Sequence, residues 1–279
     1  MQVSLQNLSA RHPAATADST PAVRNLSLSF TAGEQVAVIG PSGAGKTTFL
    51  HALACALKPS GGQLLLGQRE PWLLSTSDLQ ALRARLFLAP QVPPLPPRQR
   101  VVTSVLAGQL PQMGLAASLR SLFYPSDIPA AHQALQAFDL DEKIFERVDR
   151  LSGGERQRVG LARLLASNAS LWLVDEPLSA LDPTRASQAL QTLCGQARER
   201  GATLVCTLHQ VERALASFPR IIGLRDGELA FDSPAAEVSQ ERLRQLYAQH
   251  EDELFGATPI NDFPEQLPSG AQPAVMHCR

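Results

Sequence analysis

The sequence predicts an α/β protein built on a parallel β-sheet with helices on both faces. Gln35–Ile39 is a nearly continuous apolar run rich in β-branched residues, which is typical of a strand buried on both faces. Similar runs follow at Leu171–Val174, Thr203–Leu208 and Arg220–Leu224, and helical patterns separate them. Strands that alternate with helices at this spacing favour a parallel, two-sided sheet.

The N-terminal part of the chain predicts a smaller antiparallel sheet. Val3–Ala10 and Leu26–Phe30 alternate apolar and polar residues, the pattern of strands buried on one face. A further strand is expected at Gln63–Leu66, after two glycines. The parallel core should therefore carry an N-terminal antiparallel β subdomain.

Helical patterns occupy the segments between these strands. Helices of the core are expected at Lys46–Leu57, Leu79–Leu86, Thr184–Arg200 and Glu241–Tyr247, and a short strand at Phe87–Ala89. Val101–Val148 is also helical in composition, most clearly at Ala131–Phe138 and Asp141–Val148. The sequence therefore predicts an inserted α-helical subdomain over about residues 92–150.

The segment Pro90–Pro97 contains five prolines and excludes a central strand or a helix interior. It predicts a stiff connecting loop, although a docking site for a proline-recognising module is an alternative. Residues 250–279 are polar and contain prolines without a sustained period, so we expect a C-terminal tail over residues 249–279.

The composition excludes several function classes. The chain has 279 residues, a formal net charge of −1 and 44% hydrophobic residues, as in globular proteins, with no basic excess for coating DNA or RNA. Its four cysteines form no C-x-x-C pair, which favours a reducing compartment. We expect no signal peptide at the N-terminus. The longest uncharged stretch, Val101–Leu119, is too polar for a membrane span, so any membrane role requires a partner.

A phosphate-binding loop is predicted directly after the strand Gln35–Ile39. Gly40–Thr47 matches G-x-x-x-x-G-K-[ST] between a strand and a helix, which is the context of a P-loop NTPase with a RecA-like core. The glycines let backbone N–H groups turn toward phosphate oxygens. Lys46 should reach the β- and γ-phosphates, and the Thr47 hydroxyl should ligate Mg²⁺. The expected nucleotide contacts are Gly40, Pro41, Ser42, Gly43, Ala44, Gly45, Lys46, Thr47 and Thr48.

Two carboxylates follow the apolar run Leu171–Val174. Asp175 is expected to hold Mg²⁺, through a water molecule. Glu176 is expected to orient and deprotonate the attacking water, because in-line attack on the γ-phosphate needs a base beside the metal. Together with the phosphate loop, this pair predicts ATP hydrolysis.

Residues Leu151–Glu155 have the sequence Leu-Ser-Gly-Gly-Glu and lie shortly before the acidic pair. In this motif the sequence resembles the ABC ATPase family. The resemblance implies that Ser152, Gly153 and Gly154 bind the γ-phosphate held by the opposite subunit. Physically this turn is an anion site at a helix N-terminus. It does not serve its own phosphate loop, so the resemblance implies a dimer.

Other positions are similar to the family pattern. Gln91 resembles the family's glutamine that contacts the metal and the water lining the site. The loop that carries this glutamine contacts the permease. Ser179–Asp182 looks like the loop that crosses the dimer interface, and His209 matches the switch histidine at the γ-phosphate. His12 stands where the family has an aromatic residue on adenine; it either stacks on the base or is a solvated loop residue. The expected catalytic residues are Glu176, His209, Gln91 and Lys46, and the expected metal ligands are Thr47, Gln91 and Asp175.

The resemblance spans Val3–Tyr247 and implies an ABC ATPase domain over residues 1–248 that uses ATP and Mg²⁺. The implied partners are a second copy of the subunit, a membrane permease and a periplasmic or extracellular solute-binding protein, with no nucleic acid. The implied location is the cytoplasmic face of the inner membrane, as a peripheral protein. Such a chain energises solute import.

Two other classes explain less of the sequence. A P-loop kinase or GTPase accounts for Gly40–Thr47 and Asp175 but leaves Ser152–Glu155 and His209 unexplained. An ABC protein acting on ribosomes or DNA normally has two cassettes or a long coiled-coil insertion, and we find one cassette and no heptads.

Within the family, the amino-acid sequences of four segments are most similar to those of ATPases of phosphonate importers. They are Ser118–Tyr124, His209–Leu215, Arg220–Gly227 and Glu241–Tyr247. The loop Gln91–Pro97 and the tail depart from that subfamily. No chemistry in these residues selects a phosphonate, so phosphite, phosphate or another small polar solute remains an alternative.

Overall fold

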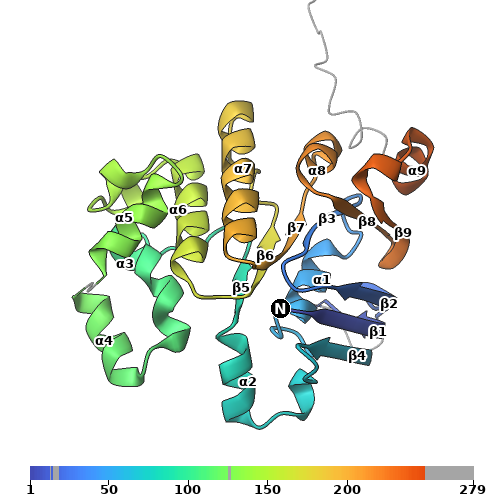
Figure 1. Ribbon diagram of the computed structural model, residues 1–279, viewed down its shortest axis with the longest axis horizontal. Helices are drawn as coiled ribbons and strands as arrows, with labels where there is room; N and C mark the ends of the chain where they lie inside the picture. The colour runs from blue at the N-terminus through green and yellow to red at the C-terminus, as the bar shows by residue number, and fades with distance from the viewer. Residues whose placement is uncertain (13, 15–18, 125–126, 249–279) are drawn as a thin grey trace, which may run out of the picture.

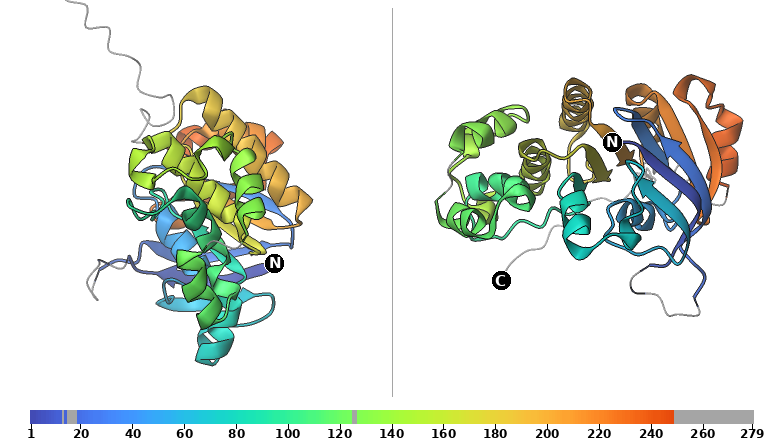
Figure 2. Two further views of the ribbon diagram at one scale, coloured as in Figure 1. Left: turned by 90° about the vertical axis from the view of Figure 1, so that its left-hand side faces the viewer. Right: turned by 60° about the horizontal axis from the view of Figure 1, so that its bottom comes forward.

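A computed structural model of the chain describes residues 1–12, 14, 19–124 and 127–248. It has the predicted α/β architecture, with a six-stranded sheet, a separate three-stranded sheet and a group of helices at one end (Figures 1 and 2). Within these described ranges, none of the helices has the length and apolar character needed to cross a membrane. The predicted tail over residues 249–279 lies outside the described residues.

The six-stranded sheet has the spatial order β5-β6-β7-β3-β8-β9. Its strands are β5 (Leu86–Ala89), β6 (Leu171–Asp175), β7 (Thr203–Thr207), β3 (Gln35–Ile39), β8 (Arg220–Arg225) and β9 (Glu228–Pro234). The first five are parallel, and β3, β6 and β7 are buried along their whole length. The carboxyl ends of these three strands therefore share one edge, where the residues that follow them can meet.

Strand β9 is an antiparallel edge strand that was not predicted from the sequence. It follows β8 through a tight turn at Asp226 and Gly227, whose φ angles are 51° and 80°. Most of its residues are exposed, so it lacks the apolar period by which the other strands were recognised. The core of the sheet is parallel, as predicted.

The N-terminal antiparallel sheet has the order β2-β1-β4. Its strands are β2 (Val23–Phe30), β1 (Val3–Ala10) and β4 (Gly61–Leu66). Leu26 and Phe30 of this sheet belong to the same hydrophobic cluster as Val38 of β3 and Phe49. The small sheet is thereby packed against the phosphate-loop side of the core.

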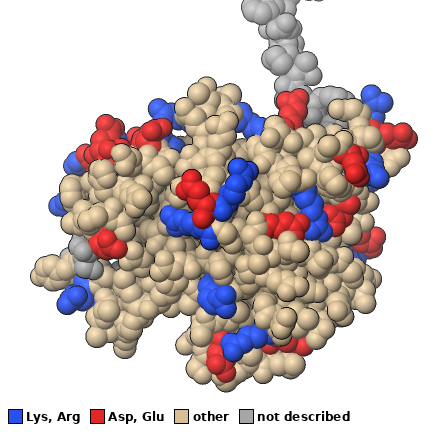
Figure 3. Space-filling view, viewed as in Figure 1, with Lys and Arg blue, Asp and Glu red and all other residues tan. Residues whose placement is uncertain are grey.

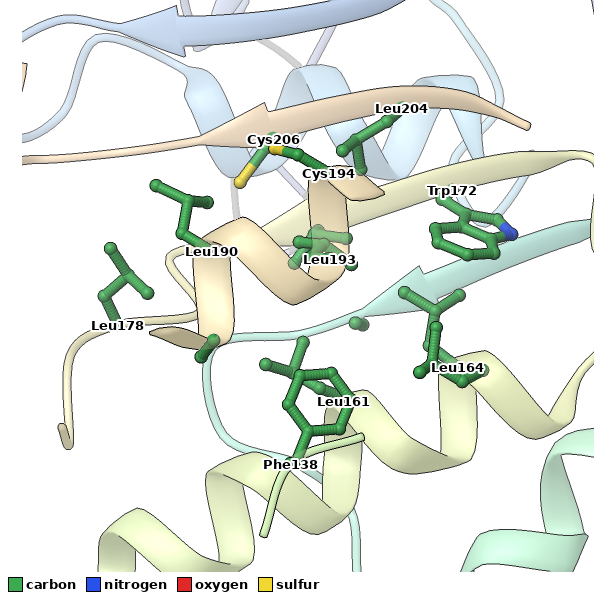
Figure 4. Packing of buried hydrophobic residues seen from close by; sticks show 14 of the residues in the cluster. Phe138, Leu161, Leu164, Trp172, Leu178, Leu190, Leu193, Cys194, Leu204 and Cys206 are labelled. Atoms are coloured by element: carbon green, nitrogen blue, oxygen red, sulfur yellow. The ribbon is translucent and has the colours of Figure 1, made fainter. Parts of the chain in front are cut away.

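Helices cover both faces of the six-stranded sheet. They are α1 (Lys46–Leu53), α2 (Thr76–Arg83), α6 (Gly153–Ala166), α7 (Pro183–Glu199), α8 (Val211–Ser217) and α9 (Gln240–Leu246). Figure 4 shows Leu161 and Leu164 on the same side of the sheet as Leu190, Leu193 and Trp172, within one large hydrophobic cluster. This packing fixes α6 and α7, and with them the motifs at their N-termini.

The remaining helices form the group at one end of the molecule (Figure 1). They are α3 (Val101–Leu106), α4 (Leu115–Phe123) and α5 (Ile128–Gln136), with short 3₁₀ turns at η2 (Ala107–Gln112), η3 (Asp141–Lys143) and η4 (Val148–Arg150). Two further 3₁₀ turns lie at η1 (Pro71–Leu73) and η5 (Ala235–Glu237).

The predicted helix over Asp141–Val148 is wrong. The carbonyl of Glu146 accepts a bond from the Val101 N–H, and the Val148 N–H donates to Gln99, at 3.0 Å each. These long-range bonds hold the segment beside the chain that enters α3. They take the place of a continuous i to i−4 series, and only short 3₁₀ turns remain.

Other helix boundaries also differ from prediction: α5 begins three residues earlier than expected and ends two residues earlier, and α7 and α9 are each shifted by one residue. Helix α1 ends earlier than expected, at Leu53, because Cys55 has a left-handed backbone with φ 54°. Helix α2 begins earlier than expected, because the Ser75 hydroxyl caps its N-terminus by accepting a bond from the Asp78 N–H. It also ends earlier than expected, at Arg83. Leu86 consequently belongs to β5.

Charged side chains of both signs are interspersed on the face of the molecule that Figure 3 shows. Arg220 is an example: its guanidinium lies 2.6 Å from both Glu34 and Asp232 and joins β8 to β9 and to the chain before β3. Burial raises the pKa of Glu34, but the bonds from Arg220 and Thr31 outweigh this effect, so the pKa is lowered. The three charges therefore act as a structural clamp.

Candidate active site

The phosphate loop, Gly40–Thr47, joins β3 to α1 as predicted. A Cβ atom on Gly40 would lie 2.0 Å from the carbonyl oxygen of Leu224, and one on Gly45 would lie 2.2 Å from that of Ala22. Gly45 also has a φ of 92°. Glycine is needed at both positions, because the loop backbone packs directly on β8 and on the chain before β2.

Lys46 lies inside the curve of this loop, with 5% of its surface exposed. Its ammonium donates to the carbonyl oxygens of Gly40 at 2.7 Å and Pro41 at 3.2 Å. Helix α1 has no side-chain cap at its N-terminus, which is the usual arrangement where a helix receives a phosphate. A cation and a helix N-terminus thus converge on one point.

Asp175 ends β6 and is held by two hydroxyl groups. The Thr47 Oγ1 donates to one carboxylate oxygen at 2.8 Å, and the Thr207 Oγ1 donates to the other at 2.6 Å. The same Thr207 hydroxyl accepts a bond from the Glu176 N–H at 3.0 Å. Thr207 therefore orients both acids. Sequence reasoning missed it, although its position at the end of the strand that precedes His209 is a signal that could have found it.

Glu176 lies between Gln91, which the sequence assigned to the metal and the water, and His209, which it assigned to the γ-phosphate. Its carboxylate accepts from Gln91 Nε2 at 2.8 Å and pairs with His209 Nε2 at 2.7 Å. Its backbone is left-handed, with φ 45°, a conformation that is unfavourable for a residue other than glycine and is found most often at functional sites. Burial raises the pKa of the Glu176 carboxyl, but the bond and charge of His209 and the charge of Lys46 outweigh it, so the pKa is lowered. The group is therefore ionised at neutral pH.

A cavity of about 470 Å³ collects most of the predicted residues. Its lining consists of His12, Ala22, Ser42, Gly43, Ala44, Gly45, Lys46, Thr47, Thr48, Gln91, Glu176 and His209. Segments far apart in the sequence thus form one polar pocket around the phosphate loop. His12 lies at its exposed rim, where its Nδ1 accepts a bond from the Ala14 N–H at 3.2 Å.

The Ser152 turn is not among the residues that line this cavity. Ser152 and Glu155 form a capping box at the start of α6, in which the serine hydroxyl and the glutamate carboxylate each accept a backbone N–H. A Cβ atom on Gly154 would lie 3.0 Å from the Ala180 carbonyl oxygen, and Asp182 caps α7 close by. The two predicted interface motifs therefore lie together at a second, exposed position.

The side-chain oxygen atoms of Thr47 and Asp175 are suitable ligands for Mg²⁺. Thr47 and Asp175 supply a hydroxyl and a carboxylate, the hard donors that Mg²⁺ prefers. Over the described ranges, no group of three His, Cys, Asp or Glu side chains could hold a metal by itself. Mg²⁺ commonly takes its remaining ligands from water and substrate phosphates, so this donor set fits the ion together with a nucleotide.

Comparisons with known proteins identify relatives of this chain. The ABC transporter family matches residues 23–179. Over the full length of both chains, the sequence is 66% identical to the phosphonates import ATP-binding protein PhnC of Polaromonas sp. (strain JS666) and 64% identical to PhnC 2 of Albidiferax ferrireducens. A solved dimer of an ATP-binding cassette, in a post-hydrolysis state with ADP and Pi, is similar with a TM-score of 0.70 and 27% identity. The likeness covers 84% of this chain and 98% of that one.

Proposed function

Because the chain belongs to the ABC transporter family and is an ATP-hydrolysing subunit of it, we propose that it energises the import of phosphonates. The observation that supports the substrate is the identity of 66% and 64%, over complete chains, to two proteins named for phosphonates import. The phosphonate itself is recognised by partners, namely a membrane permease and a solute-binding protein.

ATP binds, in this proposal, in the cavity around the phosphate loop. Lys46 neutralises phosphate charge, and the backbone N–H groups of Gly43 and Gly45 contact phosphate oxygens. Thr47, Asp175 and Gln91 would hold Mg²⁺, which supplies charge neutralisation for the phosphates when it is bound. His12 lies at the rim of the same cavity, where it can cover the adenine.

Hydrolysis is assigned to Glu176 as the general base. Its carboxylate is ionised and is held by Gln91 and His209 beside the phosphate loop, within one cavity. A water molecule that gives its proton to Glu176 can attack the γ-phosphate, while His209 contacts that phosphate. The products are ADP and phosphate.

Two copies of the chain form the working unit. Ser152, Gly153 and Gly154 lie at an exposed helix N-terminus and do not line the cavity of their own chain, so they are placed to serve a partner. Asp182, in the adjoining loop, lies at the same interface. A dimeric solved relative with ADP and Pi supports this arrangement.

If the site is completed by a second copy, ATP turnover per chain should rise with protein concentration and then saturate. The measurement is phosphate release over a range of subunit concentrations, with the mass in solution followed by light scattering. Ser152→Ala should lower the plateau while ATP binding to the single chain persists. Turnover by a proven monomer that is independent of concentration would contradict the dimeric site.

Coupling to the membrane is assigned to the Gln91 loop and the helices after it. We regard residues 92–150 as a helical subdomain within an ATPase domain of residues 1–248. Pro93 of this loop lies 2.6 Å from the position that a Cβ atom on Gly160 would take, so the loop packs directly on α6. A permease that contacts the loop from the cytoplasmic face of the inner membrane could thereby act on the Ser152 turn. The subunit is peripheral, and no nucleic acid takes part.

Cells that lack this chain should fail to grow with methylphosphonate as the only phosphorus source and should grow normally on inorganic phosphate. The wild-type chain should restore growth, and a chain carrying Glu176→Gln should not. Uptake of labelled methylphosphonate by the same cells separates transport from later metabolism. An equal defect on phosphate, or undiminished growth on methylphosphonate, would contradict phosphonate as the imported solute.

A further inference from the structure

Tyr247 joins the end of helix α9 to the beginning of the phosphate loop. Its side chain is buried, with 1% of its surface exposed, and its hydroxyl accepts a bond from the Gly40 N–H at 3.2 Å. Helix α9 lies beyond residues 23–179, the part of the chain that matches the ABC transporter family. The contact is therefore an addition to the machinery that the family match covers.

Gly40 is held on both of its peptide groups. Its N–H donates to Tyr247, and its carbonyl oxygen accepts from the Lys46 ammonium at 2.7 Å. On a third side, the Leu224 carbonyl of β8 occupies the space that a side chain would need, at 2.0 Å. The two peptide groups on either side of Gly40 thus depend on different partners: the first on the phenol of Tyr247 and the second on the lysine expected at the phosphates.

The position of Tyr247 is itself fixed from two directions. Leu243 and Leu246 are buried in the large hydrophobic cluster, with 2% and 1% of their surface exposed. Arg225, at the end of β8, donates to the carbonyl oxygens of Gln245 at 2.5 Å and Ala248 at 3.4 Å. Figure 1 shows α9 beside β8 and β9. The helix end and the strand end therefore form one support behind the loop.

We propose that Tyr247 is a positioning residue for ATP: its hydroxyl fixes the Gly40 peptide and holds the phosphate loop in the shape that receives the nucleotide phosphates. A phenol does this well because its ring packs in the core while its oxygen accepts a backbone N–H. This inference rests on the proposed nucleotide site at Gly40–Thr47, and it makes α9 part of that site.

The alternative is that Tyr247 is a core residue whose hydroxyl merely finds a partner. Phenylalanine distinguishes the two, because it keeps the ring and removes the oxygen. Without that oxygen the buried Gly40 N–H must turn toward another acceptor. This changes the backbone at Gly40 and with it the next peptide group, whose carbonyl oxygen is bonded to Lys46. Binding of ATP must then restore the loop, and this reorganisation weakens affinity.

Tyr247→Phe should weaken binding of ATP and ADP by about 3- to 10-fold, the range expected for one hydrogen bond. Binding of adenosine, which lacks phosphates, should not change. In steady-state hydrolysis the KM for ATP should rise while kcat is retained, because saturating ATP restores the loop. The measurements are titration calorimetry with each nucleotide and initial rates on the full-length protein, together with its melting temperature.

The matched control is Tyr124→Phe, because Tyr124 is the other tyrosine of the chain and is 75% exposed on the helical end of the molecule. It should leave all three affinities unchanged. Unaltered ATP affinity and KM in Tyr247→Phe, with normal loss in Lys46→Ala, would overturn the role of Tyr247 and leave the nucleotide site standing. Unaltered ATP affinity in Lys46→Ala would instead overturn the nucleotide site itself. An equal loss for adenosine in Tyr247→Phe would mean general destabilisation and would also overturn the proposal.

Discussion

Replacing Glu176 with glutamine should lower ATP turnover by about 10²- to 10⁴-fold while ATP binding is retained, since this is the usual contribution of a general base. The amide keeps the shape of the carboxylate but cannot take a proton from water. Gln91 and His209 can still bond to it, because an amide can flip and an imidazole can change tautomer. The fold should therefore be unaffected. Phosphate release measures turnover, and titration with ATP measures binding.

The dimer offers a second readout for this variant. Since ATP should remain bound without being hydrolysed, the Glu176→Gln chain should accumulate as an ATP-bound dimer, which the wild-type protein should form only transiently. Size-exclusion chromatography in ATP and in ADP detects it. Glu142→Gln is a matched control, because Glu142 is an exposed carboxylate with 77% side-chain exposure. Wild-type turnover in Glu176→Gln would show that the base lies elsewhere.

Replacing Lys46 with alanine should weaken ATP binding by about 10- to 100-fold, as expected when charge-assisted hydrogen bonds to phosphate are lost. The loss should appear in binding itself and not only in turnover, because the lysine neutralises charge that ATP already carries in the ground state. ATP should lose more affinity than ADP, since the ammonium reaches the γ-phosphate as well as the β-phosphate. Titration calorimetry with both nucleotides provides the measurement.

Lys58→Ala is the control for Lys46→Ala, because Lys58 is one of three lysines in the chain and is exposed beyond the end of α1. Its removal changes the net charge equally but leaves the loop intact. If the two variants bound ATP with the same affinity as the wild type, the loop Gly40–Thr47 would not be the phosphate site.

The buried parallel strands were predictable from the sequence because their residues are apolar on both faces. Gln35–Ile39 was predicted with the observed bounds of β3, and Leu171–Val174 with an end one residue short of β6. Strand β9 was not predicted because most of its residues are exposed, so its sequence has no apolar alternation. Its strand conformation is stabilised by antiparallel pairing with β8. The short turns over Asp141–Val148 escaped because their backbone groups bond to residues 99 and 101, which local propensity cannot reveal.

The sequence by itself determined the chemistry of the protein. The spacing of Gly40–Thr47 and the order in which Asp175, Glu176 and His209 follow strands require no coordinates, because short motifs carry their own backbone geometry. The sequence likewise placed Ser152–Gly154 at a helix start.

Only the tertiary structure decided which other residues form hydrogen bonds to these motifs. Thr207 orients both acids, and Tyr247 meets Gly40 across 207 positions of sequence. Neither contact follows from a local pattern, because each depends on the parallel pairing of strands and on where a later helix packs. The local sequence around a hydroxyl group does not reveal which group it will bond to. Tertiary packing decides the partner, as it does for the Tyr247 hydroxyl and the Gly40 N–H, which lie 3.2 Å apart.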